Sequence, residues 1–100
     1  MSLAIAGTVR IPVENIEALK PHMQAMIAAT RAEDGCETYS FALDVVEAGL
    51  LRIYEVWRDR PALDAHARSA HMVTWRAAGA SHGVSDRALV IYEIANPTPL

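Results

Sequence analysis

The chain has one cysteine and no cluster of basic residues among its 100 residues. The single thiol, Cys36, cannot close a disulfide within its own chain, and it excludes a Cys-x-x-Cys redox pair and a cysteine metal knuckle. Nine Lys and Arg against twelve Asp and Glu leave a net charge of −3, which gives no electrostatic basis for binding nucleic acid. No apolar run approaches the roughly 18 residues that span a bilayer. We therefore expect a cytoplasmic protein.

Several signatures of catalysis are also absent. There is no GxGxxG, GxxxxGK, HExxH or GxSxG motif. The sequence therefore gives no case for a bound dinucleotide, for phosphoryl transfer or for a serine esterase. Chemistry would have to come from histidines, carboxylates and aromatic side chains. The length and the apolar fraction of 52% suit one globular domain, which we place at residues 1–95, with a tail at residues 96–100.

The apolar patterns predict the order βαββαβ. The expected strands cover residues 3–11, 36–44, 50–57 and 85–94. The expected helices cover residues 13–32 and 60–79. This order predicts an α+β fold of the ferredoxin-like type, a split sandwich with a four-stranded antiparallel sheet and two helices on one face.

Three residues mark local features of these elements. Pro21 lies inside the first helix, so we expect a kink or a broken first turn there. Gly7 lies in mid-strand, where another group often approaches the backbone closely. Ser69 can cap a helix, so we expect the second helical region to pause at this residue.

Two strands are apolar in both phases, Leu50–Trp57 and Ala88–Ile94. An antiparallel sheet with one wet face should alternate apolar and polar residues. The helices can cover only one face, and a second apolar face of this size would be unusual on a monomer. We therefore expect a homodimer packed through the sheet face. The alternative is a face covered by the C-terminal tail.

The candidate functional residues gather where the hairpin leads into the second helix. His66 follows Leu63 by three positions, so it lies near the helix face that meets the sheet and could act as a general base. Glu55 and Trp57 share one phase of their strand. A buried carboxylate needs a partner, and His66 is a candidate partner for Glu55. The alternatives are structural: His66 bonded to a carbonyl, Glu55 bonded to an arginine or a backbone amide, and Trp57 in the core.

Four further side chains complete the expected substrate-binding set. Tyr39 could donate a hydrogen bond to a substrate oxygen or anchor the dimer face. His71 could line the mouth of the pocket or be solvated. Trp75 and Arg76 follow on the same helical segment. Because the histidines lack the i, i+4 spacing that puts two imidazoles on one helix face, we predict no metal site, although Glu55 with the two histidines is an alternative ligand set.

In this order and spacing, the residues resemble the antibiotic biosynthesis monooxygenase (ABM) domain family. The resemblance covers nearly the whole chain. It is carried by Glu33-Asp34-Gly35-Cys36, Tyr39, Glu55-Val56-Trp57, Ala62-Leu63, His66, Ser69 and His71. Proteins of this family are small and ferredoxin-like, and they dimerise into an α+β barrel.

For the oxygenase branch, the resemblance implies a cofactor-independent monooxygenase without flavin, haem or metal. A quinol or polycyclic phenol then supplies the electrons to molecular oxygen once it is deprotonated, and the protein supplies a dry pocket, a base and hydrogen-bond donors. His66 is the implied base or anion stabiliser. Trp57 and Tyr39 are the implied walls and donors, with Glu55 and His71 in support.

Other activities compete with this interpretation. The haem-degrading branch fits poorly, because Gly7-Thr8 stands where that branch has an asparagine and His66 stands where it has a tryptophan. A proton-abstracting isomerase or lyase, or a non-catalytic binding dimer, could use the same pocket. An isomerase of a phosphorylated substrate would need a basic cluster, and the nearby candidates in sequence are Arg52, Arg58, Arg60 and Arg76.

Overall fold

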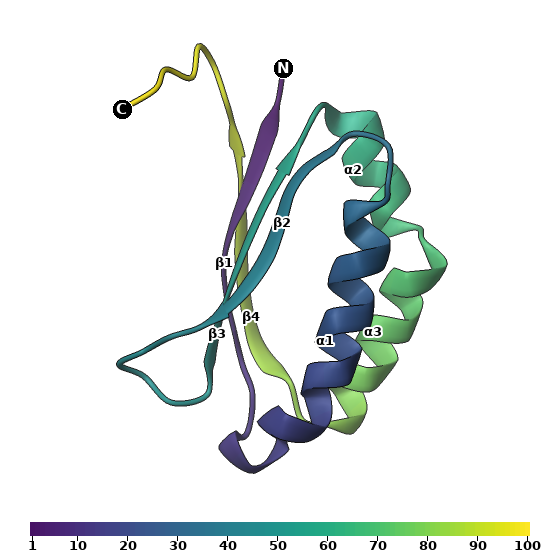
Figure 1. The fold of residues 1–100 in the computed structure, drawn as a ribbon, viewed down its shortest axis with the longest axis vertical. Coiled ribbons are helices and arrows are strands. Elements are labelled where there is room, and N and C mark those ends of the chain that lie inside the picture. Colours follow the sequence, from purple (N-terminus) through teal and green to yellow (C-terminus); the bar gives the residue numbers. More distant parts are fainter.

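The computed structural model describes residues 1–100 and confirms the ferredoxin-like α+β fold. The strands are β1 (Leu3–Arg10), β2 (Cys36–Leu43), β3 (Leu50–Trp57) and β4 (Ser85–Glu93). A 3-10 turn, η1 (Val13–Asn15), precedes the helices α1 (Ile16–Arg31), α2 (Arg60–Ala67) and α3 (Ala70–Ser81). All three helices lie on the same side of the sheet (Figure 1).

The sheet has the strand order β2-β3-β1-β4, and every neighbouring pair is antiparallel. Gly7 lies on the central strand β1, opposite Ile53 of β3 and Leu89 of β4. A Cβ atom at this position would collide with the carbonyl oxygen of Ala88. The close approach predicted at Gly7 is therefore the approach of the β4 backbone, which only a residue without a side chain permits.

One of the two predicted helix features is seen. The 3-10 turn η1 precedes α1, but α1 continues through Pro21 without interruption, so the break expected at this residue is not seen. The hydroxyl of Ser69 accepts a hydrogen bond from the Met72 amide at 3.2 Å, so this residue caps α3 and separates it from α2. Asp59 caps α2 in the same way, through the Ala62 amide at 3.0 Å.

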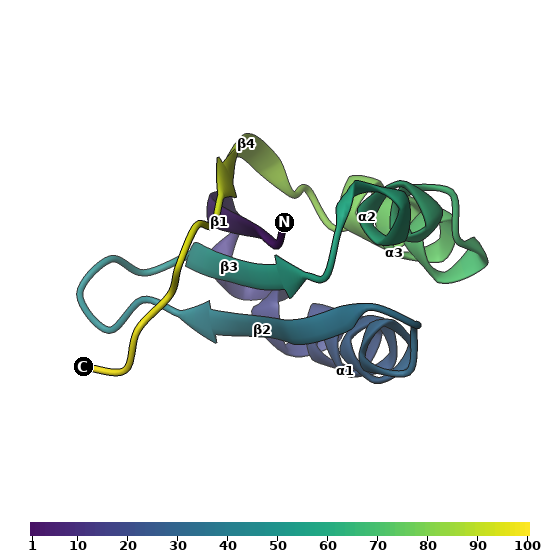
Figure 2. The ribbon, with the colours of Figure 1, turned by 90° about the horizontal axis from the view of Figure 1, so that it is seen from above.

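The inward face of the sheet packs against the helices in two apolar clusters. One cluster surrounds Trp57 near α2, and the other surrounds Leu19 and Leu51 farther along α1. These three side chains are among the largest that are fully removed from water. Seen from above, α1 lies beside β2, while α2 and α3 lie together on the other side of the helical layer and β4 turns away from them (Figure 2). β4 is accordingly exposed along most of its length.

No helix of this fold combines the length and the apolar character that crossing a membrane would require.

Candidate active site

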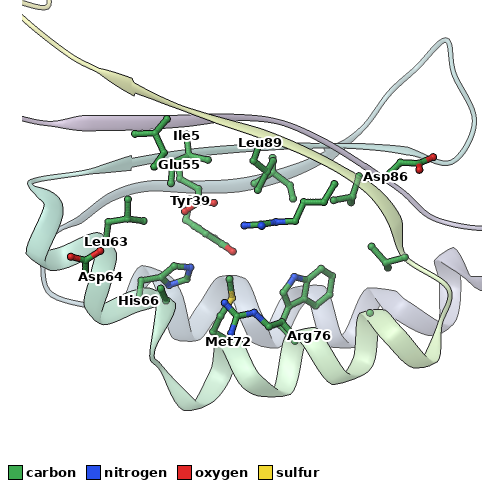
Figure 3. Close-up of a pocket in the computed structure, with 18 of the residues that line it drawn as sticks. Ile5, Tyr39, Glu55, Leu63, Asp64, His66, Met72, Arg76, Asp86 and Leu89 are labelled. Carbon is green, nitrogen blue, oxygen red and sulfur yellow. The ribbon is translucent and has the colours of Figure 1, made fainter.

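A cavity of about 720 Å³ lies between the inward face of the sheet and the helices α2 and α3. Its volume is in the range of small-molecule sites, and most of its lining is apolar. In Figure 3, Tyr39 extends from the sheet with its hydroxyl towards the cavity, and His66 extends from α2 towards it. Arg76 and Met72 enter from α3. Polar groups of different elements therefore converge on an apolar space.

Three titratable side chains meet beside this cavity through one carboxylate oxygen. Glu33 Oε2 lies 2.6 Å from Nδ1 of His66 and 2.8 Å from Nε2 of His71. Glu33 belongs to the turn after α1, His66 to α2 and His71 to the first turn of α3. Because an ionised carboxylate only accepts hydrogen bonds, both imidazoles donate to it. His66 then carries its proton on Nδ1, and its Nε2 is left with a free lone pair.

The free nitrogen of His66 reaches the cavity. The residue is 2% exposed, and its ring centroid lies 4.7 Å from that of Trp57 and 5.4 Å from that of Tyr39. The only sealed side-chain polar atom without a hydrogen bond is Oγ1 of Thr30. Nε2 of His66 makes no hydrogen bond, so it must be open to the cavity that His66 lines. The orienting carboxylate and the free lone pair are the two features of a positioned general base.

Glu55 and Trp57 differ from the sequence-based expectation. Trp57 is 0% exposed and does not line the cavity. Its ring packs against the ring of His66. Its Nε1–H donates to Oε1 of Glu55 at 2.9 Å, and Glu55 makes no hydrogen bond to His66. The carboxylate partner of His66 is Glu33. Burial raises the pKa of Glu55 above its usual range, while the Trp57 hydrogen bond and the charges of His66 and Arg87 act in the opposite direction.

We expect the Glu55→Gln substitution to raise the melting temperature by a few degrees at pH 8 and to leave it unchanged at pH 4. The raised pKa means that the folded protein holds this proton more tightly than the unfolded chain does, so ionising Glu55 costs stability as the pH rises above about 4.5. The glutamine oxygen still accepts the Trp57 hydrogen bond. Thermal unfolding followed across pH tests this, with the exposed Glu93→Gln as control. A variant that is less stable at pH 8 would contradict it.

The other expected residues divide into two groups. Tyr39, Trp75 and Arg76 line the cavity together with Glu55 and His66. His71 does not line it and instead contacts Glu33 from the outer side, with its side chain 24% exposed. Burial raises the pKa of Tyr39 far above its usual range, so its hydroxyl stays protonated and remains a hydrogen-bond donor at neutral pH.

The polar residues at the site that were not found from the sequence include Glu33 and Arg87. Glu33 was part of the family-like pattern, but no role was assigned to it. Arg87 lines the cavity from β4, in the same strand phase as Leu89 and Ile91. The period-two alternation of that strand could have placed Arg87 on the inward face. No comparable periodicity exists in the turn that holds Glu33.

Comparison with known proteins identifies the family. The sequence profile described as antibiotic biosynthesis monooxygenase (ABM) matches residues 2–78. The chain belongs to the ABM family. An ABM-like pattern of Tyr39, Glu55, His66 and His71 is thus accompanied by the fold and by the cavity that the resemblance implied.

Curated relatives match over part of their length. A Mycobacterium tuberculosis protein named "Putative monooxygenase Rv0793" is 43% identical over 60 residues, which are 60% of this chain and 58% of that protein. A Synechocystis protein named "Uncharacterized protein sll1783" is 33% identical over 69 residues, which are 69% of this chain and 47% of that protein. The matched region therefore spans about half the length of these relatives.

Solved structures extend the likeness to the whole chain. The structure of Rv0793 has a TM-score of 0.81 at 29% identity and covers 99% of this chain and 100% of its own. A structure described as a "putative antibiotic biosynthesis monooxygenase" from Deinococcus radiodurans has a TM-score of 0.89, covers 100% of this chain and 98% of its own, and is 24% identical. The second comparison supports the ABM fold alone.

Glu33, His66 and His71 are also the residues with which this ABM protein could hold a metal ion. Ligand atoms of Glu33, His66 and His71 lie within 4.8 Å of one another, and two imidazoles with a carboxylate suit zinc or iron(II). The ligand set considered from the sequence had Glu55 in place of Glu33. The two nitrogens nearest Glu33 already donate protons to it, so a metal ion would have to displace both protons.

Proposed function

We propose that this protein is a cofactor-independent monooxygenase that acts on a quinol or polycyclic phenol. The observation that carries the proposal is His66, whose Nδ1 is held by Glu33 at 2.6 Å while its Nε2 opens into an apolar cavity. Membership of the ABM family supports the same reaction class. The names of relatives that contain the word monooxygenase agree with it.

The first step is proton removal from the phenolic hydroxyl. Nε2 of His66 takes the proton, and the Glu33 carboxylate stabilises the resulting imidazolium through the Nδ1–H hydrogen bond. The protonated hydroxyl of Tyr39 donates to the phenolate oxygen. The apolar lining keeps water from competing for these hydrogen bonds. Trp75, rather than Trp57, provides the aromatic wall because it lines the cavity.

The phenolate then supplies the electrons that reduce dioxygen and is itself oxidised. The phenolate gives one electron to dioxygen, and the substrate radical and superoxide combine to form a carbon–oxygen bond. The peroxide anion that results takes back the proton from His66 and then loses water together with the hydrogen on the same carbon, which leaves a carbonyl group. For a methylene centre of the anthrone type, one substrate and one dioxygen yield one quinone and one water. The methylene carbon supplies all four electrons, so no external reductant is needed.

Oxygen uptake tests the proposed function directly. Purified protein, dialysed against a chelator, is incubated with a panel of hydroquinones and anthrones, and oxygen consumption is recorded together with the products. The proposal expects uptake that the chelator leaves intact. Uptake that requires an added metal ion would point instead to the Glu33, His66 and His71 ligand set. No uptake with any substrate would favour the isomerase or the non-catalytic binding dimer.

We also propose that two copies pack through the outer face of the sheet. Tyr54, Val90 and Tyr92 are 47%, 51% and 54% exposed on this face. Across the strands they are paired with the small residues Ala4 and Ala6. The C-terminal tail leaves them open to solvent. A second copy would cover this apolar patch, which is unusual on a monomer.

We expect the Val90→Glu substitution to convert the dimer to a monomer. A buried, unpaired carboxylate in the interface costs several kcal/mol, which is enough to dissociate a dimer of moderate affinity. Size-exclusion chromatography with light scattering measures the mass. The matched control is Val73→Glu, because Val73 is 61% exposed on α3, away from the sheet. A wild-type protein that is monomeric at every concentration would contradict the proposed dimer.

A further inference from the structure

We infer that the substrate carries an anionic group, a carboxylate or a phosphate, which Arg76 and Arg87 bind at the exposed side of the cavity. The inference names the substrate class for the proposed function and rests on it for the reacting phenol. Both arginines line the cavity, Arg76 from α3 and Arg87 from β4. His66 and Tyr39 lie at its buried side. The lining of the cavity thus combines a proton-accepting group with two cationic groups.

The two arginines differ from most others of the chain in having no partner. Four arginines lie within 4.0 Å of a carboxylate, namely Arg10, Arg52, Arg58 and Arg60. Arg31 donates from Nε to the carbonyl oxygen of Tyr39. Arg76 and Arg87 form no ion pair and no side-chain hydrogen bond, although both face a cavity. Their guanidinium groups are therefore free to bind a ligand.

The carboxylates that line the cavity do not neutralise this charge. Asp64 pairs with Arg60 at 3.0 Å, and Asp86 lies 4.0 Å from Arg10. Glu55 accepts a hydrogen bond from the indole N–H of Trp57. The charge of Arg87 nevertheless acts on Glu55, where it favours the ionised carboxylate and so opposes the effect of burial. The field of Arg87 therefore reaches into the cavity, where it would also favour an anionic ligand.

A guanidinium group presents a planar fork of donors that matches two oxygens of a carboxylate or phosphate. Met72, Trp75 and Leu89 also line the cavity and provide an apolar surface for an aromatic body. The lining therefore fits an aromatic compound that carries both a phenolic hydroxyl and an oxyanion. The nearby basic residues named from the sequence included Arg52 and Arg58, which are paired elsewhere, and did not include Arg87.

Equilibrium binding of redox-inert probes tests the inference. Isothermal titration calorimetry compares 2-naphthoate, 2-naphthyl phosphate and the neutral 2-naphthamide with the full-length protein. We expect the anions to bind about tenfold more tightly than the amide. Arg76→Gln and Arg87→Gln should each weaken anion binding about fivefold, and the double variant should bind the anions no better than the amide. The matched control is Arg68→Gln, because Arg68 is exposed, unpaired and outside the cavity lining.

The relative affinity of the two anions distinguishes the two sources of the oxyanion. A preference for naphthoate supports an aromatic acid, and a preference for naphthyl phosphate supports a phosphate ester. Equal affinities for amide and anions, anion binding that the arginine substitutions do not change, or no binding of either anion would overturn the inference. The probes are not oxidised and need no dioxygen. The result therefore stands apart from the oxygen-uptake experiment, and failure of one can be told from failure of the other.

Discussion

The His66→Gln variant is expected to lose about 10³-fold in kcat for oxygen uptake, with KM changed by only a few-fold. General-base catalysis contributes about 10²- to 10⁴-fold, and glutamine cannot take a proton at neutral pH. Its amide group can still donate to Glu33 in place of Nδ1–H. Glutamine is preferred to alanine because the His66 ring packs against Trp57 and Tyr39, where alanine would leave a void.

Two measurements and a control variant accompany the His66→Gln experiment. Thermal unfolding shows whether the variant keeps its fold. The pH–rate profile should lose its acid limb, since that limb reports protonation of the base. The control is His22→Gln, because His22 lies on the exposed side of α1 and its only aromatic neighbour is His82. A folded variant with unchanged kcat and an unchanged pH profile would remove His66 from the mechanism.

The fold could be predicted from the sequence because its signals are local and agree with one another. Apolar runs bounded by turn residues placed all four strands within one residue of their observed ends. Ser69 was recognised as a cap, and the helix does break there. Gly7 was recognised as a point of close approach, although the identity of the approaching strand depends on the sheet order. The dimer stays a prediction.

The site was predictable only where side-chain direction follows from element phase. The strand phase placed Glu55 on the inward face, but it also placed Trp57 there. Phase alone does not distinguish an inward residue beside a cavity from one covered by a helix. Trp57 lies at the end of β3, beneath the His66 ring, and is completely covered. The cavity is therefore not lined by Trp57; the tryptophan in its lining is Trp75.

The meeting of Glu33, His66 and His71 depends on two features that no periodicity encodes. On a continuous helix, residues five positions apart point about 140° apart, so His66 and His71 would not have faced one carboxylate. The break at Ser69 reorients α3 and removes that restriction. Glu33 lies in an irregular turn, held by its amide to the carbonyl of Thr30 at 2.9 Å. The residues that Glu33 contacts therefore depend on where that turn ends relative to the later helices α2 and α3.

The Glu33→Gln variant is expected to lose about 10²-fold in kcat with little change in melting temperature. The glutamine oxygen can accept both imidazole N–H groups, so the His66 tautomer is preserved. What is lost is the negative charge, which makes the hydrogen bond to the imidazolium about twice as strong as a neutral one. Without that charge, the imidazolium that forms when His66 takes the substrate proton is less stabilised, so kcat falls.

The melting temperature separates an electrostatic role of Glu33 from a purely structural one. A structural defect would lower the melting temperature together with kcat. The control is Glu37→Gln, because Glu37 is exposed on β2 and makes no contact with either histidine. An unchanged kcat would show that Glu33 does not stabilise the imidazolium. Comparison with His71→Gln then tells whether the second imidazole, which shares the same carboxylate oxygen, weakens that stabilisation in the wild-type protein.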